Sequence, residues 1–193
     1  MSLNRLLLTL LLAPIAIAQT QPQPQPKPQP KPANLRSILL EQLRSTHNKA
    51  EWFVPVNTAV AGLTPEQARW IPQSQVAKNP APADHSVGML ANHLLFWNQQ
   101  TLSRMKNPKA PAYNGSNEET FNKFDAASWT STVQQLDQVL TDLEHLVETA
   151  DDAHLQQWAS PVAHIGAHNA YHTGQIILIR KLQGTWDPTK GVK

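Results

Sequence analysis

Apolar residues recur at alternating intervals of four and three residues along much of the chain, and this spacing predicts amphipathic helices. The clearest stripe predicts a helix from Trp129 to Val147, and its members are Trp129, Val133, Leu136, Leu140, Leu143 and Val147. Another stripe predicts a helix that begins after Asp84 or Ser86, either of which can act as N-cap, and runs to about Met105. Its members are Val87, Leu90, Leu94, Leu102 and Met105.

A looser stripe predicts a helix from about Leu35 to Ala61, formed by Leu35, Leu39, Leu43, Ala50, Val54 and Val60. Pro55 should kink or shift this helix, because a proline ring clashes with the preceding turn. The run Thr64–Gln67 (Thr-Pro-Glu-Gln) has the features of a capping box with proline in the first turn. It predicts a short helix that ends near Trp70, followed by a polar loop over Gln73–Pro82.

The C-terminal part of the chain predicts a short helical turn over Asp151–Trp158 and then a last helix from about Pro161 to Leu182. Gly184 is the expected stop, since glycine is favoured just after a helix ends. Asn107–Asp125 is a long connection with several helix breakers. No segment shows a strand pattern of any length. Four long helices with short extra helices in the connections predict an all-α fold, a four-helix bundle.

The N-terminal residues have a different composition. Residues 1–18 resemble a secretory signal peptide, with Arg5 before an apolar run and Ala16-Ile17-Ala18 as the cleavage pattern. Six of the 16 prolines lie between Pro22 and Pro32, which predicts an extended Pro/Gln-rich linker over residues 19–33. We therefore expect residues 34–193 to form the folded domain. The chain is expected to be exported, periplasmic or secreted, without a stable membrane span after cleavage; a retained anchor is the alternative.

Charge and cysteine content narrow the possible partners. The formal net charge is only +2 and no dense basic block occurs, so nucleic acid is not an expected partner. The chain has no cysteine. Any metal ion must then be held by histidine, carboxylate or water.

Three histidines, His164, His168 and His172, recur at every fourth residue of the last predicted helix. A step of four residues turns a helix by only about 40°, so neighbouring imidazoles point the same way and two of them can bind one metal ion. The position after His168 is Asn169, so the motif lacks the glutamate of the zinc-protease pattern. The alternative is a solvated helix face that is merely rich in histidine.

Two segments, Ser86–Trp97 with His93 and His168–Ile176 with the pair His168 and His172, resemble the DinB/YfiT-like superfamily. The resemblance covers about Leu35 to Leu182. It implies an up-down-down-up four-helix bundle in which His93, His168 and His172 hold one divalent metal ion. The bundle order needs a long crossover, and Asn107–Asp125 is long enough to provide it.

Other polar residues are candidates for the surroundings of this site. His164 and Gln175 lie about one turn from the ligand pair, and Gln175 can orient an imidazole. Trp97 shares a flank of its helix with His93. His47 and Asn57 are further pocket candidates, although a histidine on an apolar stripe is equally expected to be a core residue. His85, His145 and His154 are expected at the surface.

Three neutral imidazoles leave a metal ion an open coordination position, which is the pattern of catalytic sites. Zinc is the metal we expect first, and nickel or iron also suit imidazole ligands. These features favour a metal-dependent hydrolase acting on a small molecule. The alternatives are a metal-dependent thiol S-transferase and a non-enzymatic module that binds a metal or small ligand. A dimerisation unit is a further alternative, since a homodimer could form through an apolar face.

Overall fold

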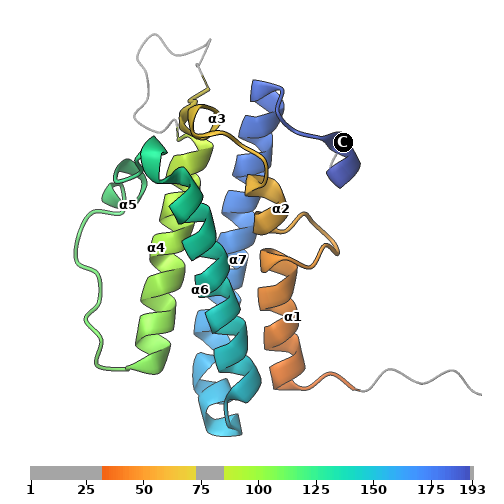
Figure 1. The fold of residues 1–193 in the computed structure, drawn as a ribbon. Helices are drawn as coiled ribbons and strands as arrows, with labels where there is room; N and C mark the ends of the chain where they lie inside the picture. Colours follow the sequence, from red (N-terminus) through yellow and green to blue (C-terminus); the bar gives the residue numbers. More distant parts are fainter. Residues whose placement is uncertain (1–31, 73–84, 192–193) are drawn as a thin grey trace, which may run out of the picture. The chain divides into compact units, whose positions relative to one another are not determined.

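Four long helices lie side by side in the computed structural model, which describes residues 32–72 and 85–191 (Figure 1). They are α1 (Leu35–His47), α4 (Val87–Lys106), α6 (Trp129–Thr149) and α7 (Asp152–Gln183). Shorter elements occupy the connections: α2 (Val56–Val60), α3 (Pro65–Arg69), α5 (Glu119–Asn122) and the 3-10 turns η1 (Ala126–Ser128) and η2 (Pro188–Lys190). The described residues contain no strand, so the predicted all-α class is confirmed.

Several predicted features fall on residues that are not described. The expected signal peptide, the linker up to residue 31, Asp84 and the loop expected over Gln73–Pro82 all lie outside the described residues. Within residues 32–72 and 85–191, no helix combines the length and the apolarity that crossing a bilayer requires.

The helix boundaries follow from local capping chemistry. The Ser86 hydroxyl accepts a hydrogen bond from the Met89 amide and so caps α4, as its position predicts. Thr64 and Gln67 form the predicted capping box at the start of α3. Gly184 ends α7 with a φ of 75°, a left-handed conformation that glycine adopts without steric cost. These three predictions are confirmed.

The core lies between the four long helices. In Figure 1, α4 and α6 both descend the view, whereas α1 and α7 run in the opposite direction. Helix α4 packs against α6 and α7, and α1 packs against the same two helices from the other side. The buried stripe predicted for α6 is central to this core, and Leu136, Leu140, Leu143 and Val147 are all almost fully buried.

Two predicted boundaries are wrong. Helix α1 ends at His47 instead of continuing to Ala61, and Pro55 is the N-cap of a separate helix, α2. Helix α7 begins at Asp152, so the predicted turn over Asp151–Trp158 is its first part and Pro161 lies inside it. The Asp151 side chain accepts from the His154 amide and starts the helix there. The apolar stripe then continues across the exposed proline through Leu155, Trp158, Val162 and Ile165.

A buried arginine attaches α2 and the C-terminal segment to α7. Arg180 is 5 % exposed, and its Nη1 donates to the carbonyl oxygens of Ala59 (2.6 Å) and Ala61 (3.0 Å). Its Nη2 donates to the carbonyl oxygen of Thr185 at 2.9 Å, and the guanidinium lies 5.3 Å from the centre of a Trp186 ring. Burial lowers the pKa of Arg180. One side chain therefore satisfies carbonyl groups from two segments that are far apart in the sequence.

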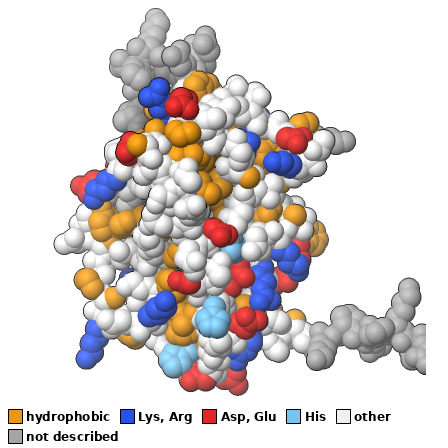
Figure 2. Space-filling model, viewed as in Figure 1, with side chains coloured by type: hydrophobic (Ala, Val, Ile, Leu, Met, Phe, Trp, Pro, Cys, Tyr) orange, Lys and Arg blue, Asp and Glu red, His pale blue; other side chains and the backbone are white. Residues whose placement is uncertain are grey.

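Charged side chains join α1 to the end of α6. The Arg36 guanidinium donates to the carbonyl oxygens of Val147 (3.0 Å), Glu148 (2.8 Å) and Ala150 (2.7 Å), which are among the last carbonyls of α6. Arg44 forms ion pairs with Glu144 and Glu148. Figure 2 shows acidic and basic side chains interspersed over this face of the molecule.

Candidate metal centre

The imidazoles of His93, His168 and His172 converge between α4 and α7. Each ring offers one nitrogen, and these three atoms all lie within 4.8 Å of one another. Nε2 of His93 is 3.0 Å from Nε2 of His168. Since zinc–imidazole bonds are about 2.0–2.1 Å long, two ligands of a tetrahedral ion stand about 3.3 Å apart. The three rings therefore lie at a spacing that could hold a metal ion.

A buried amide pair accompanies the histidines. The side chains of Asn98 on α4 and Asn169 on α7 donate to each other's Oδ1 atoms, at 2.7 Å and 3.1 Å. Asn98 also donates to the Leu94 carbonyl oxygen. Asn169 occupies the position after His168 at which the zinc-protease pattern has a glutamate. It faces α4, not the pocket, and a charged glutamate in this buried position would be costly.

Two of the rings are anchored through their second nitrogen. His93 Nδ1–H donates to the Thr120 hydroxyl at 2.5 Å, because that hydroxyl donates its own proton to the Asn117 carbonyl oxygen at 2.6 Å. His172 Nδ1–H donates to Oε1 of Gln175 at 2.6 Å. Both arrangements leave Nε2 with its lone pair free, as in metal sites where a second group orients each histidine ligand.

The ring of His168 is held differently. Its Nδ1 is buried and has no hydrogen-bond partner among the described residues. Its Nε2 faces Nε2 of His93, which carries a lone pair because Nδ1 holds the proton. Two such nitrogens attract only if a proton or a cation lies between them. A divalent cation bound by both nitrogens would therefore fit this contact.

The electrostatic environment keeps the triad unprotonated at neutral pH. Burial, with a contribution from the neighbouring histidines, lowers the pKa of His93 to about 3. Burial and the nearby His172 lower the pKa of His168 to about 4. Burial also lowers the pKa of His172, although its hydrogen bond with Gln175 opposes this shift. All three therefore present lone pairs, which is the form that binds metal.

The triad lies at the wall of an open pocket of about 680 Å³ between α4 and α7. His164 and Trp97, both candidates from the sequence, line this pocket. The other lining residues are Thr101, Arg104, Asn117, Phe121, Pro161, Ile165 and Tyr171. No Asp or Glu lines it among the described residues. The candidate metal position is thus accessible to a small molecule.

A sequence model of the DinB superfamily matches residues 56–176, well over half of the chain. The chain belongs to the DinB superfamily. The match includes all three histidines of the triad and begins after α1. No curated protein and no solved structure matches the chain.

Two candidates from the sequence lie elsewhere in this DinB-superfamily fold. His47 is 1 % exposed and sits between α1 and α6, where its Nδ1–H donates to Glu144 (2.7 Å) and its Nε2–H to Asp137 (2.9 Å). Asn57 donates to the same Asp137 carboxylate at 2.5 Å. Neither residue lines the pocket of the triad. Their interpretation as residues of this pocket is wrong, because both side chains bind carboxylates on α6 instead.

The charge of His47 predicts a pH-dependent stability. Burial works to lower the pKa of His47, but the carboxylates of Glu144 and Asp137 outweigh it and raise the pKa above 6.5. This contribution is complete below the unfolded-state pKa and is lost as the pH rises through the folded-state value. The pKa of Asp137 is lowered by His47 and Asn57, so its contribution is present above about 3.8 and is lost in more acid solution.

We therefore expect the difference in unfolding free energy between wild type and His47→Gln to be largest in mildly acidic solution. The difference should shrink as the pH rises above neutrality. Urea unfolding of both proteins over a pH series measures it, and subtracting the two curves removes the contribution of the triad. A difference that grows with alkaline pH would contradict the assignment of a charged His47.

Of the three histidines expected at the surface, two lie there and one does not. His145 and His154 are exposed, as predicted. His85 is not, because only 18 % of its side chain is exposed and its ring stacks on Phe121 with centroids 4.0 Å apart. The opposite neighbour of Phe121 is His93, stacked at 3.8 Å. The prediction for His85 is wrong because an aromatic residue from the connection covers it.

The sequence did not reveal the residues that support the triad from outside the bundle. Phe121 and Thr120 lie on α5, a short helix in the connection between α4 and α6. They have no periodic pattern that would mark them as buried. Tyr171 belongs to the histidine motif itself, and its hydroxyl accepts from Nε2 of Gln175 at 3.2 Å. Its place directly before His172 in the sequence is the signal that could have identified Tyr171 as a pocket residue.

Proposed function

We propose that this protein is a metal-dependent hydrolase of small molecules, with one divalent ion held by His93, His168 and His172. The observation that carries the proposal is the convergence of three unprotonated imidazoles on an open pocket. Two anchored rings and the close approach of two Nε2 atoms support it. Zinc is the proposed metal, since three imidazoles with an open position are typical of its catalytic sites.

A divalent ion held by these three histidines would supply Lewis acidity and would lower the pKa of a water molecule to about 7. The residues of the chain supply the rest. Thr120 and Gln175 keep the rings of His93 and His172 in one tautomer. Trp97 and Phe121 provide apolar walls for the pocket. His164 is exposed at the pocket and outside the ligand set, so we assign it the transfer of a proton to the leaving group.

One observation favours a second function, thiol S-transfer. Such a reaction needs no carboxylate base because the metal ionises the thiol, and no Asp or Glu lines the pocket among the described residues. The proposed export of the chain argues against thiol S-transfer, and this export is inferred from residues 1–18 alone. Reducing thiol pools are largely absent outside the cytosol.

Removal and return of the metal tests the proposal. The purified protein is expected to contain one divalent ion per chain by elemental analysis. Treatment with a chelator should abolish hydrolysis of a panel of small esters and amides, and added zinc should restore it. The same samples are assayed for transfer of a thiol to an electrophile. Turnover of thiols without turnover of esters would favour the second function, and a protein that binds no metal would contradict both.

A further inference from the structure

A second hollow adjoins the pocket of the triad. It has a volume of about 400 Å³ and is lined by Thr101, Arg104, Met105, Pro108, Gln157, Trp158 and Pro161. Thr101, Arg104 and Pro161 also line the pocket of the triad. The two hollows are therefore neighbours in one groove between α4 and α7, and Arg104 stands where they meet.

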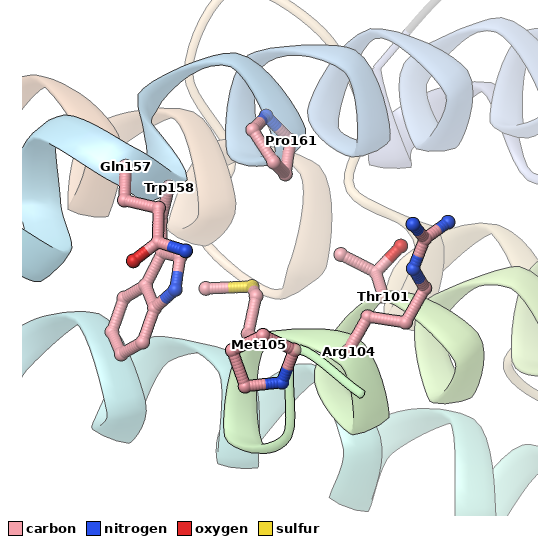
Figure 3. Close-up of a pocket in the computed structure, with 7 residues that line it drawn as sticks. Thr101, Arg104, Met105, Gln157, Trp158 and Pro161 are labelled. Atoms are coloured by element: carbon pink, nitrogen blue, oxygen red, sulfur yellow. The ribbon is translucent and has the colours of Figure 1, made fainter. Parts of the chain in front are cut away.

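Arg104 extends across this groove. Figure 3 shows its side chain reaching from α4 toward α7, on the same side of Met105 as Thr101, with Gln157 and Trp158 on the other side. It is exposed, and within residues 32–72 and 85–191 it makes no hydrogen bond or ion pair. A guanidinium carries five donors in a planar fork. All of these donors face the groove or solvent and are available to a ligand.

The position of Arg104 relates it to the triad. It follows His93 by eleven residues on α4, which corresponds to about 16 Å along the helix axis. Side chains on a helix lean toward its N-terminus, so Arg104 leans toward His93. A molecule that reaches from the triad to the guanidinium must be extended, with several bonds between its two ends.

The charges in the groove indicate the ligand. Among the described lining residues Arg104 is the single Lys or Arg, and none is Asp or Glu. One planar guanidinium matches one carboxylate, which it can bind through two parallel hydrogen bonds. Beyond it, Met105 and Trp158 are 6 % and 7 % exposed and form an apolar floor.

We propose that Arg104 binds the carboxylate of an extended substrate whose reacting group lies at the triad. The substrate class is a small molecule with a carboxylate at one end and a hydrolysable bond at the other. This inference rests on the proposed function, since the triad must hold the metal for the far end of the molecule to be fixed.

Hydroxamic acids with two kinds of tail test the proposal, because the hydroxamate binds the metal and the tail reports the subsite. One series ends in a carboxylate and the matched series ends in a methyl group, with increasing chain length in both. Calorimetric titration of the zinc-loaded protein measures the dissociation constants. At the best chain length the carboxylate should bind about tenfold more tightly or better, and added salt should reduce this preference.

Two variants complete the experiment. Arg104→Gln should lose the preference for the carboxylate and still bind the methyl-ended series as wild type does. Lys106→Gln removes an exposed cation near the end of the same helix, outside both hollows, and should keep the preference. A preference that survives in Arg104→Gln, or is absent from wild type at every length, overturns the inference alone. Binding of neither series contradicts the metal centre as well.

Discussion

Replacement of His168 by alanine is expected to abolish stoichiometric metal binding and, with it, hydrolysis. His168 is the best position for this test because its Nδ1 has no hydrogen-bond partner among the described residues. Removing the ring therefore takes a partner only from Nε2 of His93 among the groups described. His93 and His172 differ, since their rings satisfy Thr120 and Gln175. The unfolding free energy of metal-free His168→Ala should stay within about 1 kcal/mol of metal-free wild type.

His164→Ala is the matched control, one turn earlier on the same helix and in the same pocket. We expect this variant to retain its metal while the rate of hydrolysis falls, since His164 is assigned to proton transfer and not to metal binding. Elemental analysis and turnover are measured on both variants. Full metal content in His168→Ala would refute the ligand assignment.

Replacement of Arg180 by alanine is expected to destabilise the fold by about 3 kcal/mol or more. The change removes donors from the carbonyl oxygens of Ala59, Ala61 and Thr185. It also leaves a cavity where the guanidinium stem was buried. The Ala59 carbonyl, whose hydrogen bond is buried, costs about 1–3 kcal/mol when it loses its partner. The part-buried carbonyls of Ala61 and Thr185 cost less, because water can replace the donor. Urea denaturation of the metal-free protein measures the loss.

Arg180→Lys separates charge from hydrogen bonding. Lysine keeps the positive charge but cannot donate to the carbonyls of both segments in the planar arrangement of arginine. Its unfolding free energy should lie between those of wild type and Arg180→Ala. Lys106→Ala, at an exposed position on α4, should change stability by less than about 0.5 kcal/mol. Equal stability of Arg180→Ala and wild type would show that α2 does not depend on this anchor.

The sequence predicted correctly the helices in which buried residues recur at regular helical spacing. Helices α4 and α6 have one apolar stripe each and end at clear breakers, so their positions were predicted to within a few residues. Helix α7 is predicted to start near Pro161, but it begins at Asp152 and Pro161 lies inside it. Its ring is exposed and the buried stripe passes beneath it. A proline on an exposed face of a long helix cannot be distinguished from a helix start by spacing alone.

The candidate site was predictable in part for a similar reason. Helical spacing places His168 and His172 on one face, whereas His93 comes from another helix and entered only through the family resemblance. His47 lies on an apolar stripe, and that stripe does not reveal that its neighbours would be carboxylates on α6. The supporting residues Thr120 and Phe121 lie in a connection without periodicity, so no pattern in the sequence indicated their burial.

Phe121 stacks between His85 and His93, so part of what orients the His93 ring lies in the connection between α4 and α6. Helix α5 orients the His93 ring through Thr120 and Phe121, and Phe121 is also buried in the hydrophobic core. This short connecting helix therefore contributes both to the core and to the geometry of the triad. A substitution at Phe121 is therefore expected to change both the orientation of the His93 ring and the stability of the fold.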